Sequence, residues 1–249
     1  MIRLWLRAAG MALGLLACVP LHYAWKLVGA RSPWPRRFLF WVGYVAGVRL
    51  KVEGTYRRTN TLFVANHATW LDIMIIGGTA GAAFVAKEEL KASRLVHWLA
   101  SLNDSIWIQR ADRSGIHGQV DVVRDVLATG RGVAFFPEAT TKGGRDVLPF
   151  RTAFFSALYP PLPGVVVQPI AIDFGDALSD VAWGDESGAS VVKRVLSRKG
   201  TIPTRLVFLE PIVPGEGVDR KALANRSREA IVGALAASDP VAQPLYPPR

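Results

Sequence analysis

The sequence predicts an α/β fold in which a mixed, largely parallel sheet is flanked by helices, with an apolar helical segment at the N-terminus. From about residue 48 onward, short apolar and β-branched runs alternate with stretches of helical periodicity. Strands that are apolar along nearly their whole length are typical of a sheet covered on both faces. Residues 1–45 lack this alternation and consist mainly of two apolar runs joined by basic residues.

The N-terminal segment begins with Arg3 and Arg7 and continues as an apolar run to about Tyr23. A basic connector follows, and apolar sequence resumes in "FLFWVGYVAGVRL". Length alone allows a signal peptide, a spanning helix or an interfacial anchor, but no convincing small-residue cleavage site follows the first run. Tryptophan and tyrosine at the edges, with arginine between the runs, favour a membrane anchor over residues 1–45, either spanning or re-entrant. A pair of ordinary core helices is the alternative.

The α/β pattern extends over residues 46–240 and is expected to form one domain. The expected strands span residues 48–54, 61–66, 82–87, 105–110, 132–137, 165–173 and 204–210. Helical periodicity lies between several of them, around residues 70–78, 88–101, 115–129 and 220–237. Residues 241–249, "VAQPLYPPR", are rich in proline and are expected to form a loose tail.

Composition and charge restrict the possible partners. The net charge is +10 and the pI is about 10.2, so we expect an anionic partner, either nucleic acid or phospholipid headgroups. The mean hydropathy of +0.22 favours lipid. The sequence contains no zinc-finger spacing and no basic run interleaved with aromatics, so we expect a membrane partner and no nucleic acid.

Cysteine and histidine usage argues against a metal site. Cys18 is the only cysteine, which excludes an intramolecular disulfide and a cysteine metal cluster. A multi-histidine site would need nearly all of the four histidines, which are His22, His67, His97 and His117. We therefore expect no bound metal.

Residues 64–76, "VANHATWLDIMII", place His67 and Asp72 between two apolar runs. The simplest interpretation is that Asn66 and Asp72 cap a helix that begins near Thr69. Positions five apart point about 140° away from each other on a regular helix, so the two ionisable groups can meet only if His67 lies in the turn before the helix. An imidazole there would lie at the carboxyl end of a strand, where open α/β sheets place their ligand crevices.

Such a pair would form a dyad of general base and carboxylate. A carboxylate bonded to one imidazole nitrogen fixes the tautomer and makes the other nitrogen a better proton acceptor. The chain has no G-x-S-x-G motif and no candidate cysteine nucleophile. The dyad would therefore activate a hydroxyl of the substrate rather than a side chain of the protein.

Four sequence blocks resemble those of the glycerolipid acyltransferases, the lysophosphatidate acyltransferase family. "NHATWLD" is similar to the family signature N-H-x-x-x-x-D, which is a weak pattern by itself. "NDSIWIQR", "FFPEATT" and "VVVQPIAI" follow in the family's order, and "FVAKEEL" between them also matches. The resemblance covers roughly residues 48–214, and the ordered blocks make it specific.

The resemblance implies roles for particular residues. His67 would be the general base, and Asp72 would orient it. The residues expected to bind substrate are Asn66, Arg110, Glu138, Thr140, Thr141 and Arg151. Considered without the other blocks, Arg110 could equally form an ion pair on the surface, and Glu138 could equally cap a helix.

The resemblance also implies a reaction. Residues 46–240 would form an acyltransferase catalytic domain that moves a fatty acyl group from acyl-CoA or acyl carrier protein to the free hydroxyl of a lysolipid. The expected acceptor is 1-acylglycerol-3-phosphate, giving phosphatidate, and the expected location is the cytoplasmic face of the inner membrane. A thioester is already activated, so no cofactor is expected.

Two positions depart from the family pattern. Ala139 and Thr141 stand where relatives often have glycine and arginine. Because Ala139 adopts positive φ only at a cost, we expect an ordinary backbone conformation there. Thr141 cannot neutralise a phosphomonoester as a guanidinium does, so Lys142, Arg145 or Arg151 would have to supply the charge. Alternatively the acceptor is less anionic, as in the lyso-ornithine lipid acyltransferase subgroup, which the Thr-Thr stretch resembles.

Two functions of other classes remain open. A lipid or thioester hydrolase could use the same dyad to activate water, although the sequence lacks a serine nucleophile motif. A membrane-binding module without catalysis would have no need of both dyad residues. Dependence of thiol release on an added lysolipid would separate the transferase from the hydrolase.

Overall fold

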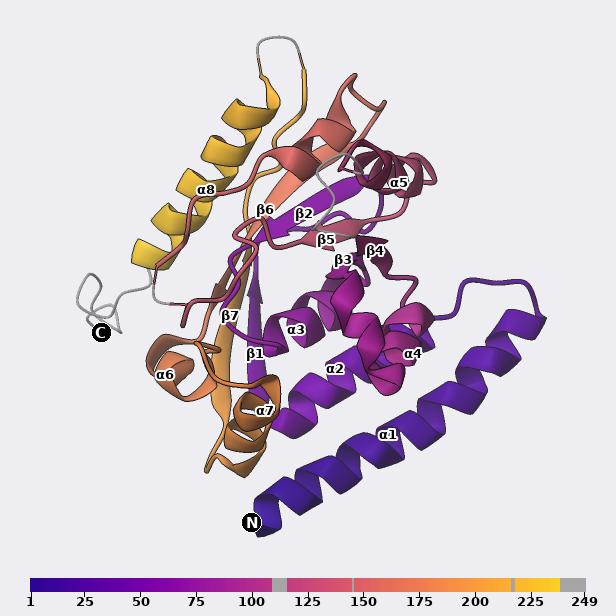
Figure 1. Ribbon diagram of the computed structural model, residues 1–249, viewed down its shortest axis with the longest axis vertical. Coiled ribbons are helices and arrows are strands. Elements are labelled where there is room, and N and C mark those ends of the chain that lie inside the picture. The colour runs from indigo at the N-terminus through magenta and orange to yellow at the C-terminus, as the bar shows by residue number, and fades with distance from the viewer. Residues whose placement is uncertain (109–115, 145, 216–217, 238–249) are drawn as a thin grey trace, which may run out of the picture.

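The computed structural model describes residues 1–108, 116–144, 146–215 and 218–237. Within these residues, seven strands form one sheet in the order β1-β7-β6-β2-β5-β3-β4 (Figure 1). The strands are β1 (Val48–Glu53), β2 (Thr61–Ala65), β3 (Ala83–Lys87), β4 (Ile106–Ile108), β5 (Val133–Phe135), β6 (Val166–Asp173) and β7 (Ile202–Phe208). Neighbouring strands are parallel except β6 and β7, which are antiparallel. The predicted mixed, largely parallel sheet is confirmed.

Helices cover both faces of this sheet, as the apolar strands predict (Figure 1). One face carries α3 (Leu71–Ala80), α6 (Leu178–Val181) and α7 (Gly188–Ser197). The other carries α5 (Ile116–Ala128), the 3-10 helix η2 (Ala153–Leu158) and α8 (Arg220–Ala236). Each face has its own core, with Leu71 and Val191 fully buried in the first and Phe155 and Leu223 fully buried in the second.

The helical stretch predicted around residues 88–101 is divided in two. The 3-10 helix η1 (Glu88–Ala92) is followed by α4 (Arg94–Leu102). Ser93 separates them because its backbone is extended, and its hydroxyl accepts a hydrogen bond from the Val96 N–H at 3.4 Å. A serine in this position acts as an N-cap, which starts a new helix rather than continuing the old one. The proposed tail at 241–249 lies outside the described residues.

The N-terminal segment forms a helical hairpin of α1 (Ile2–Leu27) and α2 (Trp34–Ala46). Figure 1 shows α3, α2 and α1 as successive layers away from the sheet. In the described part of the chain, α1 alone is long and apolar enough to cross a membrane. Leu4 and Met11 pack against the core, but many of its apolar side chains are exposed, with Leu13 and Leu16 exposed by 66% and 71%. A core helix would bury them, so the alternative of ordinary core helices is wrong for α1, and this helix indicates membrane association.

The hairpin is attached to the helix that carries Asp72. A Cβ atom added at Gly78 of α3 would lie 2.7 Å from backbone atoms of Phe40 in α2. The two helices therefore approach more closely than a residue with a side chain at position 78 would allow. The Trp41 indole N–H of α2 donates to the Gly10 carbonyl of α1 at 2.8 Å. The apolar hairpin and the candidate site are therefore parts of one packed unit.

Candidate active site

His67 and Asp72 meet at the carboxyl end of β2. His67 Nδ1 lies 2.8 Å from Asp72 Oδ2. His67 is two residues beyond the strand, and Asp72 is in the first turn of α3. The geometry predicted from the five-residue spacing is confirmed.

Asp72 also organises the turn that carries the histidine. Its side chain is fully buried, and Oδ2 accepts the backbone N–H groups of Ala68 and Thr69 at 2.7 and 2.9 Å. The interpretation that Asp72 caps the helix is wrong, because the N-cap of α3 is Trp70 and no side chain caps it. Asp72 Oδ2 instead holds the turn before the helix and binds the imidazole. When Nδ1 donates its hydrogen to Oδ2, His67 Nε2 keeps its lone pair and can accept a proton.

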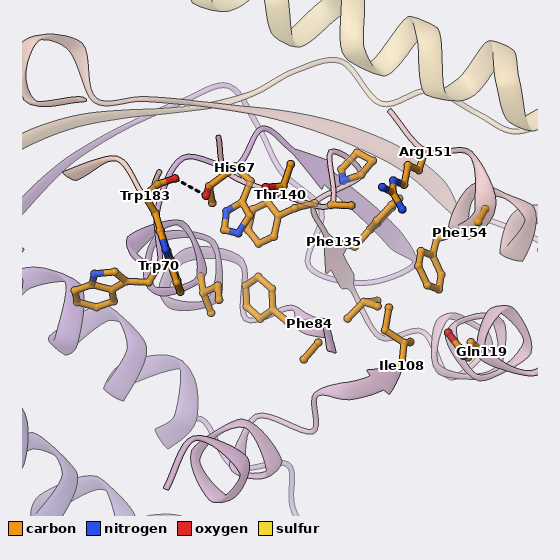
Figure 2. Close-up of a pocket in the computed structure, with 18 of the residues that line it drawn as sticks. His67, Trp70, Phe84, Ile108, Gln119, Phe135, Thr140, Arg151, Phe154 and Trp183 are labelled. Atoms are coloured by element: carbon orange, nitrogen blue, oxygen red, sulfur yellow. Dashed lines mark hydrogen bonds between the residues drawn. The ribbon is translucent and has the colours of Figure 1, made fainter. Parts of the chain in front are cut away.

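The imidazole forms part of the wall of a pocket with a volume of about 430 Å³. Its ring stacks on Phe136 with the ring centroids 4.0 Å apart and an angle of 13° between the planes. In Figure 2, His67, Thr140 and Arg151 lie along the upper edge of the pocket, above Phe84 and Ile108. The remaining lining residues are mostly apolar or aromatic, among them Trp70, Ile73, Phe135, Phe154 and Trp183. The pocket thus combines a basic nitrogen and a polar edge with an apolar interior.

Glu138 connects two loops instead of facing the pocket. Its Oε1 accepts the His67 N–H at 2.8 Å and its Oε2 accepts the Leu148 N–H at 2.7 Å. Burial raises the pKa of the Glu138 carboxyl, while these hydrogen bonds from Leu148 and His67 act in the opposite direction. Both carboxylate oxygens are occupied by backbone donors, so the geometry supports a positioning role in place of the predicted contact with substrate.

Asn66 has a similar structural role. Its Oδ1 accepts the Ile172 N–H at 2.8 Å, and its Nδ2 donates to the Ile172 carbonyl at 2.9 Å. The side chain is buried and absent from the described lining of the pocket. It ties the end of β2 to the neighbouring strand β6, which again fits positioning better than the predicted substrate contact.

The loop after β5 has a left-handed backbone conformation at Ala139, which was not expected for an alanine. Ala139 has φ +65°, so the expected ordinary backbone conformation is wrong. The left-handed region costs an L-residue other than glycine about 1–2 kcal/mol. The loop continues to Gly144, where an added Cβ would lie 2.6 Å from the Ala68 side chain. The loop therefore passes close to Ala68, the residue after His67.

Trp183 links the same loop to the histidine turn, and sequence reasoning missed it. Its backbone N–H donates to the Ala68 carbonyl at 2.7 Å, and its own carbonyl accepts the Thr141 hydroxyl (Figure 2) and the Gly143 N–H. Trp183 follows α6, more than a hundred residues beyond His67 in the chain. A tryptophan in the otherwise polar stretch "VAWGDESG" was the available signal.

The other predicted substrate contacts divide into two groups. Thr140, Thr141 and Arg151 line the pocket, as predicted for residues that contact a ligand. Arg110 and Arg145 lie outside the described residues. In the described lining, Arg151 is the one lysine or arginine.

This arrangement suits removal of a proton from a hydroxyl at the mouth of an apolar pocket. The described lining has no serine or cysteine, and its Thr141 hydroxyl is bonded to the Trp183 carbonyl, which favours a nucleophile from the substrate. The fold and the dyad thus fit a group-transfer enzyme that acts on an amphipathic substrate.

Comparison with known proteins identifies the family. A family model described as Acyltransferase matches residues 49–173. The lyso-ornithine lipid O-acyltransferase of Brucella abortus is 31% identical over 94% of this chain and 96% of its own length. A 1-acyl-sn-glycerol-3-phosphate acyltransferase of Neisseria meningitidis is 28% identical over 70% of this chain and 69% of its own length. The chain therefore belongs to the acyltransferase family, and it is an acyltransferase of lipid biosynthesis.

A solved structure has the same fold. The crystal structure of the 1-acyl-sn-glycerophosphate (LPA) acyltransferase PlsC from Thermotoga maritima matches with a TM-score of 0.61 and 21% identity, over 94% of this chain and 95% of that chain. The similarity extends beyond the α/β sheet to nearly the whole chain.

Proposed function

We propose that this protein transfers a fatty acyl group from the thioester of acyl-CoA or acyl carrier protein to a lysolipid hydroxyl. His67 Nε2 takes the hydroxyl proton, and the oxygen attacks the thioester carbonyl. The bond between carbonyl carbon and sulfur then breaks, and the departing thiolate recovers the proton from His67. The observation that carries the proposal is the 2.8 Å contact between His67 Nδ1 and the buried Asp72 carboxylate.

Positioning residues support this step. Glu138 holds the backbone N–H of His67, and Trp183 holds the carbonyl of Ala68, so the turn is fixed from both sides. Stacking on Phe136 fixes the plane of the imidazole. Holding the base in one orientation reduces the reorganisation needed to reach the transition state.

For the acceptor, we propose a lyso-ornithine lipid ahead of 1-acylglycerol-3-phosphate, which reverses the preference expected from the sequence. The Brucella relative, which is named for lyso-ornithine lipid, is 31% identical over 94% of this chain, and the Neisseria relative is 28% identical over 70% of it. The Thr141 hydroxyl is already bonded to the Trp183 carbonyl. Arg151 can pair with one carboxylate, whereas a phosphomonoester carries close to two charges that need partners.

We further propose that α1 and α2 hold the enzyme on the cytoplasmic face of the inner membrane as an interfacial hairpin. Arg7 near the start of α1 donates to the Val195 carbonyl of α7 at 2.9 Å. Near its end, the Tyr23 hydroxyl accepts the Trp98 indole N–H of α4 at 3.4 Å. A helix fixed to the domain near both ends lies along it and does not leave it to cross the bilayer, which favours the re-entrant alternative. Residues 46–240 then form the catalytic domain.

An acceptor panel tests the assignment of the headgroup. The purified enzyme is given a labelled thioester donor with lyso-ornithine lipid or 1-acylglycerol-3-phosphate, and kcat/KM is compared. We expect the first acceptor to be preferred, Arg151→Ala to raise its KM, and Thr141→Arg to shift preference toward the phosphomonoester. Thr129→Arg adds the same charge at an exposed position outside the pocket and should leave the ratio unchanged. A wild-type preference for 1-acylglycerol-3-phosphate that neither pocket variant alters would reject this assignment.

A further inference from the structure

A second pocket lies where α1 ends and α2 begins. Its volume is about 120 Å³. Gly81 and Arg131, which line it, each lie two residues before a strand, β3 and β5 respectively. The pocket therefore lies at the amino-terminal edge of these parallel strands. His67 follows β2 at the carboxyl edge, and the described linings of the two pockets share no residue. The second pocket is therefore separate from the catalytic site.

His22 is an unpartnered buried group in the wall of this pocket. Its exposed fraction is 3%, and neither Nδ1 nor Nε2 has a hydrogen-bond partner among the described residues. An imidazole always carries at least one N–H donor, and a buried donor without an acceptor costs free energy. Such a group calls for an acceptor from outside the described residues.

The charge around His22 indicates the sign of that acceptor. The charged residues in the described lining are Lys26, Arg31, Arg36, Arg131 and Asp104. Asp104 is already matched by Arg131, whose Nη1 lies 2.6 Å from Oδ2. Arg36 donates Nε–H to the Gly78 carbonyl, and Lys26 and Arg31 have no ion-pair partner in the described part of the chain. The pocket thus carries surplus positive charge beside an unused donor.

We propose that this pocket binds a phosphate group, held by the His22 N–H and by Lys26 and Arg31. The pocket is small, with about 120 Å³ against about 430 Å³ for the catalytic pocket, which suits a small anion such as a phosphate group. The headgroup of an anionic phospholipid is the favoured source, since Tyr23 and Trp25 are 47% and 42% exposed on the same turn of α1. Exposed aromatics of this kind are typical of the headgroup level of a membrane. This preferred source rests on the membrane association proposed above.

The pocket is tested with soluble probes, because any basic protein is attracted to an anionic membrane surface whether or not it has a specific phosphate site. The full-length enzyme in neutral detergent is titrated with dihexanoyl phosphatidylglycerol in one arm and inorganic phosphate in the other, and the shift in melting temperature is followed. We compare His22→Leu and the double variant Lys26→Gln/Arg31→Gln with Arg3→Gln/Arg37→Gln. The last pair removes the same charge from the same hairpin but lies outside the described lining of this pocket.

We expect the lipid to raise the melting temperature of the wild type and of the Arg3/Arg37 control. Loss of charge-assisted hydrogen bonds should weaken binding at least about tenfold in the Lys26/Arg31 pair. His22→Leu should lose part of the shift even if its melting temperature without ligand rises. If inorganic phosphate raises the melting temperature as much as the lipid does, the anion site stands but its ligand is free phosphate.

No shift in the wild type, or equal shifts in every variant, would overturn the proposal. Acyl transfer in neutral detergent is measured in parallel, and the pocket variants should retain it because they lie away from His67. If the wild type shows no acyl transfer, the proposed function is contradicted while the binding titration still tests the pocket. Failure of the proposed function and failure of the phosphate site can therefore be told apart.

Discussion

The turn around His67 and the α1–α2 hairpin differ in how they are held by the rest of the protein. At the turn, the nearby Asp72 and the distant Glu138 and Trp183 form hydrogen bonds with the backbone of three consecutive residues, His67, Ala68 and Thr69. In the hairpin, apolar side chains are exposed and His22 is buried without a partner in the described part of the chain. The turn is not fully satisfied either, since Asp72 Oδ1 and Thr69 Oγ1 are buried without a partner in the described part of the chain. Its backbone is nevertheless held by hydrogen bonds within the protein, whereas the hairpin exposes apolar side chains that suit a lipid surface.

The largest expected effect comes from removing the base. His67→Ala should lower kcat by about 10²–10⁴-fold, because general-base catalysis is lost. Membrane association should be unchanged, since the hairpin is intact. His97→Ala is the matched control, because His97 packs edge-on against Trp107 and is absent from the described pocket lining. A His67→Ala enzyme that keeps more than half of the wild-type rate would contradict the assignment.

Glu138→Gln tests whether the turn is held by its buried hydrogen bonds. The amide can accept only one of the two N–H groups from His67 and Leu148 and turns a donor toward the other. We expect a loss of about 1–3 kcal/mol in unfolding free energy, measured by chemical denaturation in detergent, together with a lower kcat. Glu186→Gln breaks the surface ion pair with Arg194 and should cost about 0–1 kcal/mol. Equal, small effects of the two substitutions would show that Glu138 does not hold the turn.

Gly78→Ala tests the contact between the hairpin and α3. The added Cβ would lie 2.7 Å from backbone atoms of Phe40, so the helices must separate, and overpacking of this kind costs about 1–3 kcal/mol. Gly233→Ala makes the same change in α8, where no atom lies within 4 Å, and should stabilise by up to about 1 kcal/mol. Thermal unfolding of both variants measures the difference. Stabilisation by both would mean that α2 does not rest closely on α3.

The smallest expected effect is a gain at Ala139. Glycine adopts the observed φ of +65° without steric cost, so Ala139→Gly should raise the unfolding free energy by about 1 kcal/mol. Ala230→Gly, in the interior of α8, should lower it by a similar amount, about 0.5–1 kcal/mol. The two melting temperatures should move in opposite directions. Movement in the same direction would indicate that the loop is not left-handed at this residue.

The strands and the dyad could be predicted from the sequence because their signals are local. Apolar, β-branched runs predicted each of the described strands. The five-residue spacing of His67 and Asp72 predicted the contact between their side chains. Helix α7 was missed because its amphipathic pattern is short and begins at a serine cap within a polar stretch. The hydrogen bonds of Glu138 and Asn66 could not be predicted, because the tertiary fold alone brings their partners, the backbones of Leu148 and Ile172, to them.

The central claim is that the dyad directs an acyl group onto a lysolipid hydroxyl and not onto water. The most direct measurement is thiol release from the acyl donor by the purified enzyme, with and without lysolipid, with the product identified by mass spectrometry. The account predicts that release depends on the lysolipid, equals the amount of acylated lipid formed, and disappears in His67→Ala. Release at the same rate without acceptor, with free fatty acid as the product, would contradict it and would show that the dyad activates water.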